Sequence, residues 1–432
     1  MRQLILVFNN GIFHLFLLFI IVVVVYCPIF DNDFVYMWDD GWQLFTRTTE
    51  SGFEWNNIVN IFIYTFRNQY FPLNQFFYML VYSFGGDYNA FSFHCFSLLF
   101  HFLNSSLVYF LFIKLLNLSG KVAVNRVRIV SFITAFAFII HPVNVESVAW
   151  VSASKVLIYT FFYLSSIYIY ILYKEKNKMK YLIISLLLFV LSFGAKEQAA
   201  ILPLCLYIID CVLGKYSEIR TFWNEKLCYW ILAVFMGIFT LYISRLSSLV
   251  EQQYSIVERI VYASYSYMEY IFKWIFPINL LYLYPFPSLP NEPMPFWVTL
   301  YPLFLLIIVI SLKETIYKYW FLKFGVLFFT INLLLVLHFI PLPRMAVIAD
   351  RYLYMPSIGL SFILSYTLVY VFLSNNRLKY YFCSICFIYF VYCMCYTHKQ
   401  IQVWYNSNTL KEKVQRLLEE RIENQEEMIY FD

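Results

Sequence analysis

The sequence predicts an all-α, polytopic integral membrane protein with a bundle of about eleven transmembrane helices. Its mean hydropathy is +0.66. Only 13% of its residues are charged, whereas about 25% is usual in soluble domains, and 22% are aromatic. Apolar runs of roughly 17 to 25 residues recur along the chain, and a helix of that length crosses a hydrocarbon core of about 30 Å. These features exclude an ordinary soluble domain.

The apolar runs place the expected spans in order. The first run begins after Arg2, is about 24 residues long, and ends in Tyr26, Cys27 and Pro28, which form a poor cleavage site. We therefore expect a retained span rather than a signal peptide. The expected spans lie near residues 4–28, 92–116, 129–141, 148–173, 180–195, 198–213, 227–244, 296–312, 319–339, 353–373 and 379–396.

Lysine and arginine residues gather in the loops that follow every second span. The clusters are Lys114, Lys121, Arg126 and Arg128; Lys174, Lys176, Lys178 and Lys180; Lys215, Arg220 and Lys226; Lys313, Lys318 and Lys323; and Arg377 with Lys379. Because such residues accumulate in cytoplasmic loops, this pattern predicts a cytoplasmic N-terminus. An odd number of spans then places the C-terminus and the remaining loops on the outer side.

Two long loops and a tail are expected on the outer side of a transmembrane domain that covers residues 1–396. The first loop, about residues 29–91, contains WNNIVNIFIYTF, an amphipathic stretch that predicts helices in the membrane interface. The second, about residues 245–295, ends in a Pro-rich stretch and predicts a re-entrant or interfacial segment. Residues 397–432 predict a charged helical tail with opposite charges at i,i+4 spacing.

Charged residues of both signs gather where the outer loops meet the membrane. They are Asp31, Asp33, Asp39 and Asp40 after the first span; His141 and Glu146 in HPVNVE; Lys155; Lys196 and Glu197 in GAKEQ; and Arg344, Asp350 and Arg351 in PLPRMAVIADRYLYMPS. Ionisable groups so close to hydrocarbon are costly unless they pair or serve chemistry, so they form a candidate functional site. The alternative is structural: the aspartates cap helices or stay solvated, His141 is a helix-corner residue, and the cations pair with the carboxylates.

A sugar carried on a polyprenyl phosphate has the chemistry that this cluster fits. Its lipid tail stays in the bilayer, and its phosphate requires Arg or Lys side chains as charge-assisted hydrogen-bond donors. A carboxylate near the sugar can take the proton of the attacking acceptor hydroxyl. The cluster therefore suggests transfer of a sugar at the outer face of the membrane.

Six sequence blocks, taken in order, resemble a known family. They are FVYMWDD; YFPLNQFFYMLVYSFGG followed by FHCFSLLFHFLNSSLVYFLF; HPVNVESVAWVSASKVLIY; LSFGAKEQAAILPLCLYIID; KWIFPINLLYLYPFP; and ADRYLYMPSIGL. They are similar to bacterial relatives of the transmembrane and tetratricopeptide-repeat mannosyltransferases, in the protein O-mannosyltransferase-like group of the GT-C glycosyltransferase fold. The likeness covers roughly residues 30–360.

The resemblance implies a GT-C-type bundle that transfers a hexosyl group from a polyprenyl-phosphate donor to an acceptor hydroxyl, with inversion. The acceptor would be Ser or Thr of an exported protein, a lipid or a glycan, and no nucleic acid would take part. The expected location is the bacterial inner membrane, with the active site on the periplasmic side. Asp39 and Asp40 align with the family's acidic pair. Either can be the base, while the other orients the acceptor or binds a divalent cation; no other cofactor is expected.

The other polar residues of the cluster are expected to assist the acidic pair. For the donor phosphate we expect, in this order, Arg351, Arg344, Lys196 and Lys155. For support we expect His141, Glu146, Glu197 and Asp350. The donor sugar, the acceptor, the metal dependence and the oligomeric state stay open at this point.

Two features depart from the family, and two other functions remain as alternatives. The tail supplies at most one vestigial tetratricopeptide-like piece, because one repeat cannot bury its face without neighbours. Val156 follows Lys155, where relatives often have an acidic residue.

The alternatives are a transporter or flippase of a polyprenyl-linked lipid or glycan, and a binding or scaffold protein of the same fold. The charges gather at one interface and no repeat of the spans is evident, which favours the transferase.

Overall fold

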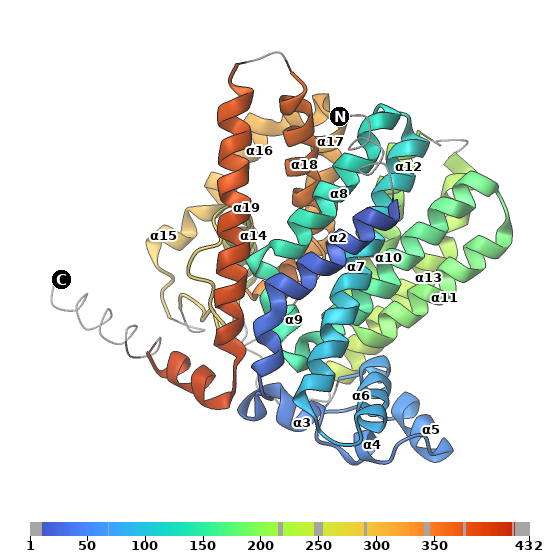
Figure 1. Ribbon diagram of the computed structural model, residues 1–432, viewed down its shortest axis with the longest axis vertical. Coiled ribbons are helices and arrows are strands. Elements are labelled where there is room, and N and C mark those ends of the chain that lie inside the picture. The colour runs from blue at the N-terminus through green and yellow to red at the C-terminus, as the bar shows by residue number, and fades with distance from the viewer. Residues whose placement is uncertain are drawn as a thin grey trace.

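The computed structural model consists of helices and connecting loops, with no β-strand among the residues that it describes. These are residues 11–67, 69–214, 219–245, 254–288, 292–340, 346–374, 377–416 and 419. The predicted all-α class is confirmed. Figure 1 shows long helices bundled side by side, with a group of short helices at one end.

A helix lies at each position where the apolar runs predict a span. They are α2 (Gly11–Tyr26), α7 (Ala90–Ser119), α8 (Val124–Ile140), α10 (Ser154–Lys176), α11 (Met179–Ala195), α12 (Leu202–Leu213), α13 (Ile219–Arg245), α16 (Tyr301–Lys318), α17 (Trp320–Leu333), α18 (Ser357–Phe372) and α19 (Lys379–Ile401). Within the described residues, six helical segments are long and apolar enough to cross a membrane, or up to seven if one bent pair counts as a single span. α11, α17 and α18 are apolar but shorter. The structure thus supports six or seven spans. The predicted number of about eleven remains a proposal.

The helix α7 lies in the core of the bundle, where it packs against α8, α10 and α2. It has 30 residues and begins where the side chain of Asn89 accepts a hydrogen bond from the backbone N–H of Phe91, at 3.1 Å. It ends at Gly120, whose φ of 62° lies in the left-handed region that glycine adopts without strain. This packing fixes the position of α10, and with it Lys155, the residue that α10 contributes to the candidate site.

The helices α17 and α18 approach each other closely because both have a glycine at their crossing. A Cβ atom on Gly325 would lie 2.6 Å from the carbonyl oxygen of Gly359, and one on Gly359 would lie 2.5 Å from the carbonyl oxygen of Gly325. Small residues let helix backbones pack this closely in membranes. Because α18 directly follows the segment that contains Arg351, this crossing helps to fix that segment.

The chain bends sharply after α8, at the predicted HPVNVE corner. The turn η3 (Pro142–Asn144) and the short helix α9 (Val145–Ala149) together lie at 59° to α8. A residue before proline avoids the helical region, and His141 is extended, with φ −76° and ψ 126°. The turn η4 (Val151–Ala153) then leads into α10. This corner places Glu146 at the end of the bundle.

The loop between α2 and α7 folds into short helices at one end of the bundle (Figure 1). They are η1 (Cys27–Asp31), η2 (Tyr36–Asp40), α3 (Gly41–Gln43), α4 (Arg47–Glu50), α5 (Trp55–Ile63) and α6 (Pro72–Gly85). α5 is amphipathic, because Trp55 and Ile63 are exposed whereas Asn57 and Ile61 are buried. The helices expected in this loop are therefore present, and the exposed face of α5 suits a membrane interface.

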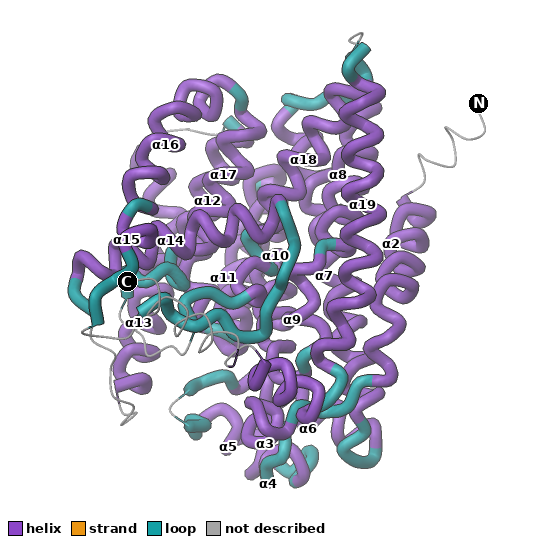
Figure 2. The backbone as a smooth tube through the Cα atoms, turned by 90° about the vertical axis from the view of Figure 1, so that its left-hand side faces the viewer, coloured by secondary structure: helices purple, strands orange, loops and turns teal. Residues whose placement is uncertain are grey.

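The second long loop contains one extended helix, α14 (Ile256–Ile275). It begins with a capping box formed by Ser255 and Glu258. It is not among the described helices that are apolar enough to span a membrane, and in Figure 2 it lies across the direction of α19. An irregular stretch then leads to α15 (Phe296–Thr299). Of the two expected arrangements, an interfacial segment fits this helix better than a re-entrant one.

The last long helix, α19, continues to Ile401, past the predicted end of the final span. The hydroxyl of Thr397 donates a hydrogen bond to the carbonyl of Ile140, at 2.7 Å. The turn η7 (Gln402–Trp404) and a helix over residues 407–416 follow. In Figure 1 this segment lies at the same end of the bundle as the short helices of the first loop. The beginning of the predicted tail is therefore packed against the bundle.

Candidate active site

The two aspartates of the predicted acidic pair have different surroundings. Asp40 is fully buried. Its Oδ2 accepts a hydrogen bond from the backbone N–H of Val35, at 2.8 Å. Its Oδ1 accepts from both the backbone N–H and the hydroxyl of Ser152, at 2.9 and 2.5 Å. Burial raises the pKa of Asp40 to about 6, although these hydrogen bonds oppose the shift.

Asp39 is partly exposed and has fewer hydrogen-bond donors around it. Its two oxygens accept hydrogen bonds from Trp42 Nε1, at 3.1 Å, and from Gln43 Nε2, at 3.2 Å. Its charge acts on the nearby cations Lys155 and Arg351. A carboxylate in this setting keeps lone pairs that can receive a proton from a ligand. Of the pair, Asp39 is thus the partly exposed carboxylate that interacts electrostatically with Lys155 and Arg351.

Arg351 pairs with Glu146, one of the carboxylates of the predicted cluster. Its Nη1 donates to one oxygen of Glu146, and its backbone N–H donates to the other at 2.7 Å. The guanidinium group also lies over two aromatic rings, 5.5 Å from the centre of Trp150 and 5.0 Å from that of Tyr352. Its side chain is 22% exposed. The ion pair joins the η6 turn (Asp350–Leu353) to the HPVNVE corner.

Lys155 and Lys196 lie near each other. Within the described residues, neither makes an ion pair at 4.0 Å or less. Their ammonium groups lie over aromatic rings instead, 5.4 Å from Phe71 for Lys155 and 5.5 Å from Tyr352 for Lys196. Lys196 is 5% exposed, and this burial lowers its pKa. Two neighbouring cations that form no close ion pair among the described residues favour the binding of an anion.

Asp350 is held by a tyrosine of the second loop. Its Oδ1 accepts a hydrogen bond from the hydroxyl of Tyr284, at 2.9 Å. Burial and the nearby charge of Glu146 raise the pKa of Asp350 well above its usual range, which favours its neutral form. Asp350 therefore connects η6 to the second loop and is not the ion-pair partner of Arg351.

His141 is bonded on both sides of its ring. Its Nε2 lies 2.9 Å from the carbonyl oxygen of Trp274 and 3.1 Å from the hydroxyl of Tyr389. Its Nδ1 accepts a hydrogen bond from the backbone N–H of Val143, at 3.4 Å. The ring stacks on that of Trp274, with centres 5.1 Å apart. This geometry matches the helix-corner role and leaves no nitrogen aimed at the acidic pair.

The structure brings most of the predicted residues into one charged cluster. Lys155 interacts electrostatically with Lys196, Asp39, Glu197 and Arg351. Asp31 and Asp33 are exposed, and Glu197 is exposed at the start of η5 (Glu197–Ile201). Arg344 lies outside the described residues.

The acidic pair is poorly suited to holding a divalent cation. In the part of the chain that the structure describes, no group of three or more His, Cys, Asp or Glu residues could hold a metal ion. The oxygens of Asp39 and Asp40 already accept hydrogen bonds from N–H and O–H donors. These donors occupy positions that a cation would need. The expected residues therefore do not fit a metal site.

Two residues of the cluster were not predicted as part of it. Ser152 fixes Asp40, and Trp150 lies beneath Arg351. Both belong to the HPVNVESVAWVSASK block, just before Lys155. A buried carboxylate needs donors, but Ser152 is 112 residues from Asp40, so no local pattern in the sequence marked it as the donor. No such pattern marked Trp150 either.

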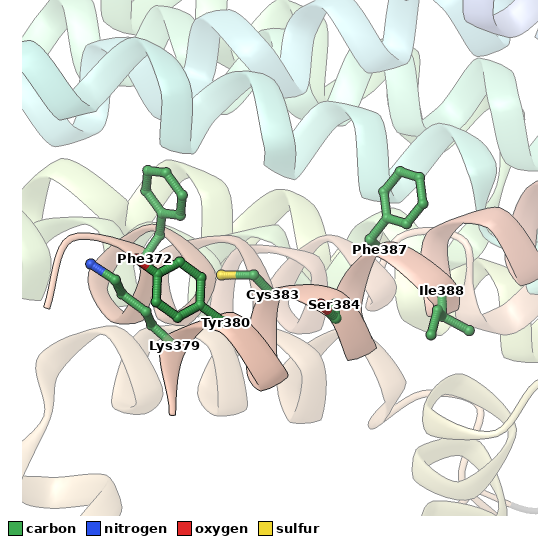
Figure 3. A pocket seen from close by; sticks show the side chains of 7 residues that line it. All are labelled: Phe372, Lys379, Tyr380, Cys383, Ser384, Phe387 and Ile388. Atoms are coloured by element: carbon green, nitrogen blue, oxygen red, sulfur yellow. The ribbon is translucent and has the colours of Figure 1, made fainter. Parts of the chain in front are cut away.

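A surface pocket lies apart from this cluster, along the first turns of α19 (Figure 3). Its volume is about 490 Å³. It is lined by Phe372, Lys379, Tyr380, Cys383, Ser384, Phe387 and Ile388. The lining has no carboxylate or histidine, and Lys379 is at the opposite end of α19 from the charged cluster. We therefore do not assign the catalytic chemistry to this pocket.

Comparison with known proteins gives no family assignment. No protein-family model matches the chain, and no curated protein matches it significantly. The resemblance to the GT-C mannosyltransferases thus depends on the six sequence blocks.

Proposed function

We propose that this protein is a membrane glycosyltransferase of the GT-C type, which moves a hexosyl group from a polyprenyl-phosphate donor to an acceptor hydroxyl. The observation that carries this proposal is the pair Lys155 and Lys196, two neighbouring cations without an ion-pair partner among the described residues. They lie beside Asp39, a partly exposed carboxylate. A donor phosphate supplies the missing anion, and its acceptor supplies the proton for the carboxylate.

In the proposed mechanism Asp39 is the general base. It takes the proton of the acceptor hydroxyl while the hydroxyl oxygen attacks the anomeric carbon of the sugar. The bond between that carbon and the phosphate oxygen breaks, and its electron pair leaves with the polyprenyl phosphate. Because attack and departure occur on opposite faces, the anomeric configuration inverts. Asp40 is the supporting member, since its oxygens are held by Val35 and Ser152.

The cations stabilise the charge that develops on the leaving phosphate. Lys155 and Lys196 act as point charges, and Arg351 adds guanidinium N–H groups that Glu146 does not use. A general base contributes about 10² to 10⁴-fold, so donor positioning and this charge stabilisation supply the rest of the acceleration.

The alternative function is transport of a polyprenyl-linked lipid or glycan. Asp210 and Lys226 form an ion pair with both side chains fully buried, and such a pair inside a membrane bundle is a usual feature of transporters. The hydroxyl of Tyr170 also bonds both oxygens of Asp210, at 3.0 and 3.2 Å. Because this pair is well satisfied and joins α12 to α13, we favour a structural role for it.

The proposed location is the bacterial inner membrane, with a cytoplasmic N-terminus and the site on the periplasmic side. The apolar helices suit a membrane protein, and the one-sided lysine and arginine clusters supply the orientation. A reporter that is active only outside the cytoplasm, fused after Asp432, should be active. If the fusion is stably expressed but its reporter is inactive, the proposed orientation is wrong.

Purified protein and labelled donors test the function. Radiolabelled polyprenyl-phosphate mannose or glucose is incubated with a Ser- and Thr-rich peptide, a lipid and a glycan as acceptors. We expect the wild-type protein to transfer label to one of them and the Asp39→Asn variant to lose this transfer. If the wild-type protein transfers no label but moves labelled lipid across liposome membranes, the function is transport.

A further inference from the structure

The segment after α19 forms part of the wall of the candidate site. Trp404 is buried, and its ring stacks on that of Trp150, with centres 5.3 Å apart and planes inclined by 12°. The guanidinium group of Arg351 lies over Trp150 in turn, 5.5 Å from the ring centre. Two aromatic rings and one cation thus form a continuous contact from the C-terminal segment to the proposed phosphate site.

The same segment holds the loop that carries the acidic pair. The backbone N–H of Asp33 donates to the carbonyl of Tyr405, at 2.7 Å. Farther along the loop, the backbone N–H of Met37 donates to the hydroxyl of Ser407, at 3.3 Å. Val35, whose N–H binds Asp40, lies between these two points. The segment therefore contacts the loop that carries the base directly and reaches the cation Arg351 through Trp150.

We propose that Trp404 is a positioning residue: through Trp150 it holds Arg351, and with its neighbouring backbone it keeps the acidic loop in place. This role rests on the proposed function, since its purpose is to fix the distance between the proton acceptor and the phosphate-binding cation. Stacked aromatic pairs are more rigid than aliphatic contacts of similar area because the ring planes fix the orientation. Residues 402–407, which belong to the expected tail over residues 397–432, are then part of the catalytic domain.

The test compares Trp404→Leu with Trp404→Phe, which keeps an aromatic ring, and with Tyr405→Leu. Tyr405 is 40% exposed and contributes its backbone carbonyl, so its variant is the matched control. Hydrogen exchange of full-length protein in detergent is measured over residues 33–43 and at Arg351. We expect faster exchange at both places in Trp404→Leu only. Equal exchange in Trp404→Leu and Tyr405→Leu would overturn the positioning role.

Binding of polyprenyl monophosphate without a sugar provides the second measurement. Loss of an aromatic contact should weaken this binding about three- to tenfold in Trp404→Leu and much less in Trp404→Phe. In an Arg351→Lys background the Leu substitution should have no further effect, because the two residues act in one chain of contacts. If the two substitutions weaken binding by fully additive free energies, Trp404 is merely structural and the proposal is refuted.

The two proposals fail in different ways. If the wild-type protein does not bind polyprenyl monophosphate, the donor class assigned above is wrong. The exchange comparison still decides whether Trp404 holds Arg351 and the acidic loop, because it requires no ligand.

Discussion

Ser152 donates two hydrogen bonds to a single oxygen of Asp40, from its backbone N–H at 2.9 Å and from its hydroxyl at 2.5 Å. The two residues are 112 positions apart, so this contact joins the first loop to the start of α10. It occupies the Asp40 oxygen that would otherwise be available to a substrate. The neighbouring Asp39 is partly exposed and interacts electrostatically with Lys155 and Arg351.

We predict that the two aspartates respond differently to the same substitution. Asp39→Asn should keep the thermal stability of the wild-type protein and lower transferase turnover about a hundredfold or more, as expected for loss of a general base. Asp40→Asn should lower stability by about 1–3 kcal/mol. The side-chain NH2 group of the asparagine would face a backbone N–H group, and two donors cannot form a hydrogen bond. Melting curves and transfer rates, with Asp31→Asn as the control, check this. Wild-type turnover in Asp39→Asn would exclude it as the base.

The buried carboxyl of Asp40 should make stability depend on pH. Burial raises its pKa from 3.8 to about 6, so the folded protein binds this proton more tightly than the unfolded chain. Its contribution to stability is therefore complete below about pH 4 and is lost as the pH rises through about 6, a change of about 3 kcal/mol at most. Unfolding in detergent between pH 4 and 7 should show this component in the wild-type protein. The component should be absent from Asp40→Asn; an identical pH profile in both proteins would contradict the assignment.

Arg351 should separate ligand binding from stability. Arg351→Ala leaves Glu146 buried without its partner and should cost about 3–5 kcal/mol of stability. Arg351→Lys keeps a charge near Glu146 but loses the planar fork, so its melting temperature without ligand should stay near the wild-type value. Polyprenyl-phosphate sugar should raise the melting temperature of Arg351→Lys less than that of the wild-type protein, because this increase depends on the affinity for the ligand. If the ligand-induced increase in melting temperature and the turnover of Arg351→Lys both equal the wild-type values, Arg351 does not bind the phosphate.

Lys196 should matter for the ligand and little for the fold. It has no ion-pair partner in the described part of the chain, so Lys196→Gln removes a buried charge without stranding a carboxylate. Stability should stay the same or rise slightly, whereas affinity for polyprenyl phosphate should fall about ten- to a hundredfold, as for loss of a charge-assisted bond. Lys379→Gln, the same charge change at the distant end of α19, is the control. Equal affinities of the two variants would argue against an anion site at Lys196.

The glycine crossing of α17 and α18 should tolerate no added methyl group. Gly325→Ala places a Cβ 2.6 Å from the carbonyl oxygen of Gly359 and should destabilise the protein by about 1–3 kcal/mol. Gly237→Ala in α13 meets no atom within 4 Å and should be neutral or stabilising by about 0.5–1 kcal/mol. Thermal unfolding in detergent compares the two. Equal melting temperatures would mean that the helices separate easily at this crossing.

Much of the architecture was predictable because it depends on local sequence. Apolar runs mark helices wherever a segment is buried in lipid or in the bundle, and the residue before Pro142 marks the corner. The last apolar run ends at Tyr396, and the polar residues Thr397 and Gln400 follow it, yet α19 continues to Ile401. Their side chains instead bond the carbonyls of Ile140 and Leu280, at 2.7 and 2.9 Å, and remain buried.

The candidate site was predictable as a set of residues but not as a set of contacts. Asp39 and Asp40 are adjacent and chemically identical, and the contact of Asp40 with Ser152, 112 residues away, contributes to the difference between their environments. The choice of Glu146 as the partner of Arg351 likewise depends on how two loops 205 residues apart pack together. No local pattern specifies such pairings, because they result from the packing of the whole bundle.

The contacts between the first loop and the C-terminal segment have a consequence for biosynthesis. Met37 and Ser407 are 370 residues apart, and Asn32 reaches the carbonyl of Ile401 across 369. The acidic loop is synthesised early, but the segment that fixes it leaves the ribosome only after every helix of the bundle. Contacts of such long sequence separation form late in folding. We therefore expect a chain that stops before residue 401 to insert its helices but to lack the contacts that hold the acidic loop, so the proposed transferase activity would require residues 401–407.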